Sequence, residues 1–537
     1  MKKLTLLFGL LTCLTLNAQQ KPKLVVGIIV DQMRMDYIYR YWDKYSDNGF
    51  KRLIGEGHLC KNAHFNYMPT YTGPGHASVY SGSTPMTHGI IANNWYEKQS
   101  GEGMYCVRDM ESSPLGTDTD AGRMSPKNLL VPSLGDAFRI SSNFKGKSIG
   151  LSIKDRGAIL PAGHSANAAY WFDYASGDFI SSSHYMDALP KWVVDFNKEN
   201  WPDKLAEEEW NTLLDINLYK ESTKDNTPYE KALMGKESPV FPYDFSEYVK
   251  ENGYYHFAAS PYGSTVLTKF AEHVIVQEDL GMDEMTDLFA LSFSSPDMIG
   301  HMCGPQSIEV QDTYLRLDLE IARLLKVLDT RLGEGSYTLF LTADHAAAPV
   351  PSYMADNGMP TEYFDSEVFE ADIKRALNEE FGEGEWIKNY SNQQFFLNHD
   401  LIDAKDVHLK EMFDVIEKTA LKNEGVAEVL TTKDLQYRTS DTEFAHLAST
   451  GWNPKRSGDV MIKYLAGWMD YGHQGTTHGT SYNYDTHVPL IFFGNGVKPG
   501  TSLQPVEITQ IVPTICLISE IAFPDASCHD AIIEVIK

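Results

Sequence analysis

Several apolar runs, each followed closely by an acidic residue or a histidine, constrain the fold of this chain more than any other feature. The run at 24–30 is continuous and ends at Asp31, and similar runs occupy 148–153, 288–293, 337–342 and 488–493. Unbroken apolar runs of this length are typical of parallel strands buried on both faces. The sequence therefore predicts an α/β fold, with a mostly parallel central sheet between helices.

The segments between these runs predict the flanking helices and two insertions. A long amphipathic helix begins at about Ile308, has Leu324 and Leu328 at core spacing, and ends near Gly333. Residues 191–285 are rich in Trp, Glu, Asp and Asn and predict a mainly helical insertion. Residues 352–440 predict a small α+β cap, after which 459–465 is expected to return to the core sheet. The cap's expected elements are helices at 368–380 and 404–420 and strands at 393–397 and 426–430.

The first 18 residues have the pattern of a secretory signal peptide, with Lys2 and Lys3 before an apolar stretch and Ala18 at the expected cleavage point. Cys13 has poor neighbours for lipid attachment. We therefore expect residues 19–537 to form an exported catalytic domain that is delivered to the periplasm, with no membrane insertion. The formal net charge of −27 argues against nucleic acid as a partner.

Thr72 is the strongest candidate nucleophile in the sequence. It precedes Gly73, Pro74 and Gly75, which leave its hydroxyl accessible and allow a helix to begin. A helix start favours anions and a partly deprotonated oxygen, which suits attack on a phosphate. The simpler interpretation is that Thr72 only caps the helix.

Six acids and imidazoles lie just past the apolar runs or in the loop before the last one. They are Asp31, Asp297, His301, Asp344, His345 and His478. Mixed carboxylate and imidazole ligands suit zinc or a similar first-row cation better than magnesium or calcium. Six ligands divide into two sites of three, and two ions about 4 Å apart can stabilise the attacking and the leaving oxygen of a phosphoryl transfer. Asp297 and His301, four residues apart, would share one face of a helix.

Three further residues are candidates for binding a phosphate. If the strand at 148–153 continues, Lys154 and Arg156 project from the same face and Asp155 from the opposite one. Asn93, in the loop that follows the Thr72 helix, is a candidate amide donor, although turn chemistry would also explain an Asn there. Five cysteines remain after cleavage, without the spacing of a zinc site, and are interpreted as structural.

Four motifs together resemble the alkaline phosphatase superfamily. They are Thr-Tyr-Thr72-Gly-Pro-Gly-His, Ser-Ser-Pro-Asp297-Met-Ile-Gly-His301, Thr-Ala-Asp344-His345 and Thr-His478-Gly. The Lys154-Asp-Arg156 segment beside a Thr nucleophile is similar to the phosphate-irrepressible alkaline phosphatases, which are exported zinc phosphomonoesterases. The resemblance runs from Lys23 to the C-terminal region, where 508–524 is similar to the family's closing strand and helix.

The resemblance implies a role for each of these residues. Asp31, Asp344 and His345 would hold one Zn²⁺, which Thr72 would also contact, and Asp297, His301 and His478 would hold a second. Asn93, Lys154 and Arg156 would bind the phosphoryl oxygens. His473 is a rival to His478, which fits the Thr-His-Gly pattern better. Ala346 and Cys303 depart from the family pattern beside two of the ligand motifs.

The sequence therefore predicts a zinc-dependent alkaline phosphatase that hydrolyses small phosphate monoesters through a phosphothreonine at Thr72, acting as a monomer. A phosphodiesterase or nucleotide pyrophosphatase on the same two-metal site is the alternative. Lys154 and Arg156 favour the monoester, because a monoester carries one more negative charge. A sulfatase would need Cys or Ser in place of Thr72. A zinc-binding protein without catalysis is the remaining alternative, and the sequence names neither the physiological ester nor the control of synthesis.

Overall fold

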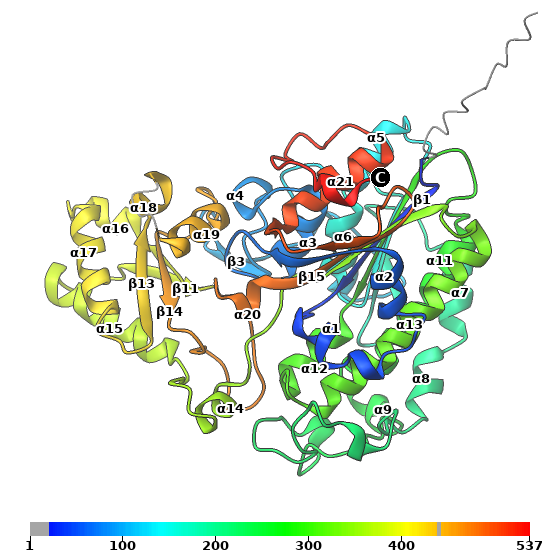
Figure 1. Ribbon diagram of the computed structural model, residues 1–537. Coiled ribbons are helices and arrows are strands. Elements are labelled where there is room, and N and C mark those ends of the chain that lie inside the picture. The colour runs from blue at the N-terminus through cyan, green and yellow to red at the C-terminus, as the bar shows by residue number, and fades with distance from the viewer. Residues whose placement is uncertain (1–20, 438–441) are drawn as a thin grey trace, which may run out of the picture.

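A computed structural model describes residues 21–437 and 442–537 (Figure 1). The expected signal peptide at 1–18, including Cys13, lies outside these residues. Within the described part of the chain, no helix combines the length and the apolar character needed to cross a membrane.

An 11-stranded sheet forms the centre of the molecule, in the order β16-β2-β15-β10-β1-β9-β6-β7-β8-β5, with β17 paired to β2. Strand β1 pairs in parallel with β9 and β10, and β6 pairs in parallel with β9 and β7. The predicted α/β fold and its mostly parallel core are confirmed. The strands are β1 Leu24–Val30, β2 His58–His64, β5 Pro114–Leu115, β6 Ser148–Ser152, β7 Ala168–Phe172, β8 Phe179–Ser182, β9 Asp287–Phe293, β10 Tyr337–Thr342, β15 His487–Gly494, β16 Gly500–Ser502 and β17 Val506–Glu507.

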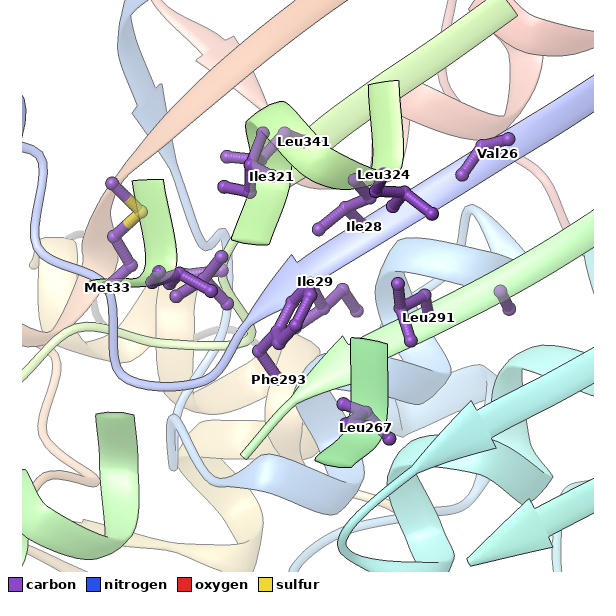
Figure 2. Packing of buried hydrophobic residues seen from close by; sticks show 14 of the residues in the cluster. Val26, Ile28, Ile29, Met33, Leu267, Leu291, Phe293, Ile321, Leu324 and Leu341 are labelled. Atoms are coloured by element: carbon purple, nitrogen blue, oxygen red, sulfur yellow. The ribbon is translucent and has the colours of Figure 1, made fainter. Parts of the chain in front are cut away.

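Helices cover both faces of this sheet (Figure 1). Gly27 of β1 faces Tyr80 of helix α3, whereas the neighbouring Ile28 lies beneath Leu324 of α13 on the opposite face (Figure 2). The flanking helices are α1 Asp36–Arg40, α2 Phe50–Glu56, α3 Thr72–Ser81, α4 Pro85–His88, α5 Leu134–Ser141, α6 Asp155–Ala162, α12 Ser295–Cys303, α13 Ile308–Leu332, α20 Asn483–Thr486 and α21 Ile511–Ser519. The long helix predicted from Ile308 to Gly333 is confirmed.

The segment expected as a helical insertion at 191–285 contains α7 Lys191–Lys198, α8 Trp201–Ala206, α9 Tyr248–Asn252, α10 Tyr255–Ala258 and α11 Pro261–Gln277. Its last helix, α11, packs against β6, β9 and α13. This helix is therefore a layer of the core, because its apolar face covers the same side of the sheet as α13.

A second, smaller body combines four antiparallel strands with helices on one side and has its own apolar cluster. Its sheet has the order β11-β12-β14-β13, with β11 Ile387–Ser391, β12 Gln394–Leu397, β13 Val426–Thr431 and β14 Val460–Tyr464. Helices α15 Ser366–Phe381 and α17 Leu409–Ala420 pack on it. The remaining elements nearby are α14 Pro351–Asp356, α16 His399–Ala404, α18 Thr432–Tyr437 and α19 Glu443–Gly451.

Two assignments from the sequence are wrong here. The run at 459–465 was expected in the core, but β14 pairs with β12 and β13 in the small sheet. A short apolar run has the same appearance whichever sheet receives it, which explains the error. The segment 508–524 forms a 3₁₀ turn and helix α21 without a strand, because the preceding β17 has already ended at Glu507.

Candidate active site

The candidate residues gather where three neighbouring strands of the central sheet end. Asp31 follows β1 directly, and Asp344 and His345 follow β10. Asp297 lies in the first turn of α12, just after β9, and His478 lies in the loop before α20. Because β1, β9 and β10 are parallel neighbours, their carboxyl ends share one edge of the sheet, which is where open α/β sheets bind ligands.

Thr72 is the first residue of α3, and Tyr71 holds the capping position with an extended backbone. The interpretation of Thr72 as a simple helix cap is therefore wrong. Its Oγ1 lies 3.4 Å from His345 Nε2. The helix approaches the end of β10 so closely that a Cβ on Gly75 would lie 2.2 Å from the backbone oxygen of Asp344. The glycine thus allows the contact that places Thr72 over the site.

Asp31, Asp344 and His345 form the first potential metal-binding group, with ligand atoms all within 4.8 Å of one another. All three side chains are completely buried. Asp31 Oδ1 and Asp344 Oδ2 are buried oxygens without a hydrogen-bond partner in the described part of the chain. An unpaired buried carboxylate oxygen is costly, and a bound cation would remove that cost.

Asp297, His345 and His478 form a second compact group by the same criterion. His345 therefore adjoins both groups, whereas the sequence placed it in the first one only. His301 adjoins the second group, because its Nε2 lies 3.2 Å from Asp297 Oδ1 and its ring centroid lies 5.1 Å from that of His478. Asp297 and His301 share one face of α12, as their spacing predicted.

The three histidines have a common orientation. The Nδ1 atoms of His301, His345 and His478 lie 2.8, 3.0 and 2.7 Å from the backbone oxygens of Thr476, Ala346 and Thr70, respectively. A carbonyl oxygen can only accept, so each Nδ1 carries the proton and each Nε2 is left as a lone-pair donor. Burial lowers the pKa of His345. Burial also lowers the pKa of His478 well below its ordinary value, and electrostatic repulsion from His345 and His301 lowers it further. Neutral imidazoles are the form that binds a metal.

The charge of the site also fits cations. Three buried carboxylates, Asp31, Asp297 and Asp344, face one buried ammonium, that of Lys154. Burial and the carboxylates of Asp297 and Asp344 raise the pKa of Asp31 well above its ordinary value. Three carboxylates against one ammonium, with orphaned oxygens and neutral imidazoles, fit two divalent ions held by oxygen and nitrogen ligands.

Lys154 lies between the two groups: its Nζ donates to Asp31 Oδ2 at 2.7 Å and also to Asp297 Oδ2. The predicted strand geometry around it is wrong. Strand β6 ends at Ser152 and α6 begins at Asp155, so Lys154 caps the helix and Arg156 lies in its first turn. Asp155 is an acidic residue in the first turn of α6, where the helix dipole favours a negative charge, and it therefore favours a helix start over a continued strand.

Asn93 lies beside the start of α3, and Arg156 lies in the first turn of α6, which packs against α3. Arg156 Nη1 donates to the Tyr105 hydroxyl at 3.1 Å, and its Nε is buried without a hydrogen-bond partner among the described residues. Asn93 Oδ1 accepts from the backbone N–H of Gly73 at 2.7 Å. This bond fixes the amide so that its NH₂ remains available to a ligand beside Thr72.

His473 lies outside the site, with an exposed ring that packs against Tyr363 at a centroid distance of 4.5 Å. Among the described residues the five cysteines are unpaired, and Cys303 is buried beside α13 rather than in either metal-binding group.

The sequence reasoning missed two residues that hold the candidate ligands. Gln32 Nε2 donates to Asp297 Oδ1 at 2.7 Å, and its backbone N–H donates to Asp344 Oδ1 at 3.2 Å. His76 Nδ1 lies 2.9 Å from the Thr72 backbone oxygen and 3.4 Å from Asp344 Oδ2. His76 was detectable, because it lies four residues after Thr72 and so one helical turn along the same face.

Comparison with known proteins agrees with this geometry. Residues 25–488 match the family model described as type I phosphodiesterase / nucleotide pyrophosphatase. A protein from Myroides odoratus named a calcium-transporting ATPase is 43% identical over 96% of this chain and 95% of its own length. Alkaline phosphatase PafA from Elizabethkingia meningoseptica is 40% identical over 98% of this chain and 97% of its own.

A crystal structure of alkaline phosphatase PafA superimposes on the chain with a TM-score of 0.94 at 39% identity, covering 97% of this chain and all of that one. The full-length match, the fold and the four motifs agree with the resemblance seen in the sequence. The chain therefore belongs to the alkaline phosphatase superfamily, in the branch of the phosphate-irrepressible alkaline phosphatases with a threonine nucleophile.

Proposed function

We propose that this protein is an exported phosphomonoesterase that uses two Zn²⁺ ions and forms a phosphothreonine at Thr72. Asp31, Asp344 and His345 would hold one ion near Thr72, and Asp297, His301 and His478 would hold the other. When bound, such a pair of ions supplies Lewis-acid stabilisation of the attacking and leaving oxygens.

The side chains of the site supply the nucleophile and the groups that bind the phosphoryl oxygens. Thr72 Oγ1 attacks the phosphorus, so that one O–P bond forms while the bond to the leaving alcohol breaks. Water then cleaves the phosphothreonine, which releases inorganic phosphate and restores the hydroxyl. The amide of Asn93, the ammonium of Lys154 and the guanidinium of Arg156 meet the charge on the nonbridging oxygens in fixed positions.

The buried position of Lys154 carries the preference for monoesters. Its ammonium lies beside Asp31 and Asp297, between the two metal-binding groups. A monoester presents an additional negative oxygen there, which a diester replaces with a neutral substituent. The family model's description also covers diesterases, so Lys154 is the residue that favours a phosphomonoesterase over a phosphodiesterase. The site gives no basis for the transport activity in the Myroides relative's name.

The test compares phenyl phosphate with methyl phenyl phosphate for the wild type, Thr72→Ala and a Lys154→Met/Arg156→Ala double variant. We expect Thr72→Ala to lower kcat/KM by about 10³-fold or more and to retain bound zinc, because the other ligands remain. The double variant should lose more activity on the monoester than on the diester, by about 10²-fold. Chelation should abolish activity.

Three results would overturn the proposal. A wild type that prefers the diester would identify a phosphodiesterase. Stoichiometric zinc without release of phosphate would identify a metal-binding protein that lacks catalysis. Full activity after complete removal of metal would exclude the metal-dependent scheme. Export is tested separately by sequencing the N-terminus of protein recovered from the periplasm, where we expect a chain that begins after Ala18. The oligomeric state is tested by light scattering, which should give the mass of a monomer.

A further inference from the structure

A cavity of about 190 Å³ lies beside the site, where the small α+β body meets the core. Tyr71 and His478 line it from the core side, and Tyr390, Tyr464 and Trp468 line it from the small body. Tyr71 directly precedes the nucleophile, and its ring centroid lies 5.7 Å from that of His478. The cavity therefore adjoins both Thr72 and the second metal-binding group.

The lining of this cavity is acidic. It includes the carboxyl groups of Asp470 and Asp485, and no lysine or arginine among the residues of 21–437 and 442–537 lines it. Asp470 is exposed and Asp485 is completely buried. Neither aspartate forms an ion pair with a described basic residue, and Arg34, which acts on Asp485 electrostatically, donates to Asp36 and to the Ala347 carbonyl instead.

One oxygen of Asp485 has no hydrogen-bond partner in the structure as described. Its Oδ2 accepts from the backbone N–H and the hydroxyl of Thr480 at 2.8 and 2.6 Å, whereas Oδ1 is buried and unpaired. Burial raises the pKa of Asp485 to about 7, so the carboxyl is ionised at alkaline pH.

Five aromatic side chains also line the cavity: Tyr71, Tyr390, Tyr464, Trp468 and Tyr484. The hydroxyls of Tyr390 and Tyr464 are hydrogen-bonded to each other at 2.9 Å, which holds this part of the wall in place. Aromatic rings combined with carboxylates and without basic residues form the kind of surroundings that attract alkylammonium groups. The same lining repels a second phosphate or a carboxylate.

We infer that this cavity receives the leaving group of the substrate and selects phosphate monoesters whose alcohol carries an alkylammonium group, of the choline phosphate class. The inference rests on the proposed phosphomonoesterase function. It assigns Asp470 and Trp468 as specificity-determining residues, neither of which contacts the reacting phosphate.

The experiment compares choline phosphate with 3,3-dimethylbutyl phosphate, a neutral analogue of the same shape. The readout is the ratio of the two kcat/KM values in the wild type, Asp470→Asn, Asp470→Lys and Trp468→Leu. Because the intrinsic reactivities of the two esters cancel when enzymes are compared, only the cavity's contribution changes the ratio. We expect the ratio to fall about threefold to tenfold in Asp470→Asn and Trp468→Leu and further in Asp470→Lys.

Asp414→Asn is the matched control, since it removes an equal charge from an exposed position on α17 of the same small body. It should keep the wild-type ratio. Added salt should lower the ratio in the wild type and have little effect in Asp470→Lys. Ratios that are equal in all the Asp470 variants would overturn the inference.

Direct binding separates this inference from the proposed function. Calorimetry with choline and with 3,3-dimethylbutanol needs no turnover, and the wild type should bind choline more tightly, with the difference lost in Asp470→Lys. Failure to hydrolyse any phosphate ester would refute the proposed function, whereas equal affinity for the two alcohols would refute the cavity assignment.

Discussion

At the scale of single residues, each candidate metal ligand uses its second polar atom in a supporting contact. His301, His345 and His478 each use Nδ1 on a backbone carbonyl, which turns Nε2 toward the carboxylates. Asp297 and Asp344 are held in a similar way by Gln32, which donates its side-chain amide to one and its backbone N–H to the other. Such supporting contacts set the orientation and the affinity of metal ligands.

Replacing Gln32 tests this support. Gln32→Met keeps the side-chain length and removes the donor to Asp297 Oδ1, so we expect affinity for zinc to fall about 10-fold to 100-fold. Competition with a chromogenic chelator measures this directly. Gln99→Met, the same change at an exposed position, is the control and should bind zinc like the wild type. Unchanged affinity in Gln32→Met would show that Gln32 only fills space.

Most site residues were predictable from the sequence because apolar strands and the residues after them leave a local pattern. Asp31, Asp344 and His345 follow strands that were assigned correctly, and the structure brings them together. The relation of Lys154 to Asp31 and Asp297 was not predictable, because those contacts join positions more than a hundred residues apart. The orientation of Arg156 was missed for a local reason, namely the helix start at Asp155.

At the scale of elements, the contact between α3 and the end of β10 determines where Thr72, the proposed nucleophile, lies. The two elements touch at Gly75, whose missing side chain leaves room for the Asp344 backbone oxygen. Asp344 itself forms one side of this contact. Thr72 lies three residues before Gly75, about one turn of α3 away. A displacement here therefore moves Thr72 relative to the carboxylates of the site.

Gly75→Ala should lower kcat/KM by about 100-fold, because a shift of about 1 Å between α3 and β10 has an effect of that order. The assay uses phenyl phosphate, with circular dichroism to verify folding. Gly55→Ala in α2 is the control, since a Cβ there has no neighbour within 4 Å. An active Gly75→Ala enzyme would show that α3 adjusts without moving Thr72.

Strand assignments from the sequence failed where an apolar run could belong to either of the two sheets. Strand β14 carries the same apolar character as the core strands, and only its pairing with β12 and β13 distinguishes it. Strand β2 was also missed, because His58, Lys61 and Asn62 interrupt its apolar pattern and its partners lie far away in the sequence. Pairing over such distances is not encoded in local periodicity.

At the scale of the whole molecule, a buried acidic pair couples stability to pH. Glu230 and Glu309 are 1% and 0% exposed, and Tyr243 donates to Glu309 while Thr227 donates to Glu230. Burial, followed by the charge of Glu309, raises the pKa of Glu230 to about 9 from its ordinary 4.5. Between these two values the folded protein binds more protons than the unfolded chain, so stability falls as pH rises.

Glu230→Gln should remove this dependence. We expect the free energy of unfolding of the wild type to decline between about pH 5 and pH 9, by up to about 1.4 kcal/mol per pH unit from this group, and the variant to decline less steeply. Urea unfolding at four or five pH values measures both slopes. Glu334→Gln, at an exposed position, should follow the wild type. Parallel slopes for Glu230→Gln and wild type would contradict the assignment.

The order of the site residues along the chain has one further consequence. Asp31 lies near the start of the folded chain, whereas His478 comes only after the small body has been completed. A ribosome must therefore deliver nearly the entire polypeptide before the catalytic machinery can assemble. Unfinished or truncated chains lack a member of the second metal-binding group, and so we expect them to leave the phosphate esters of the cell that makes them intact.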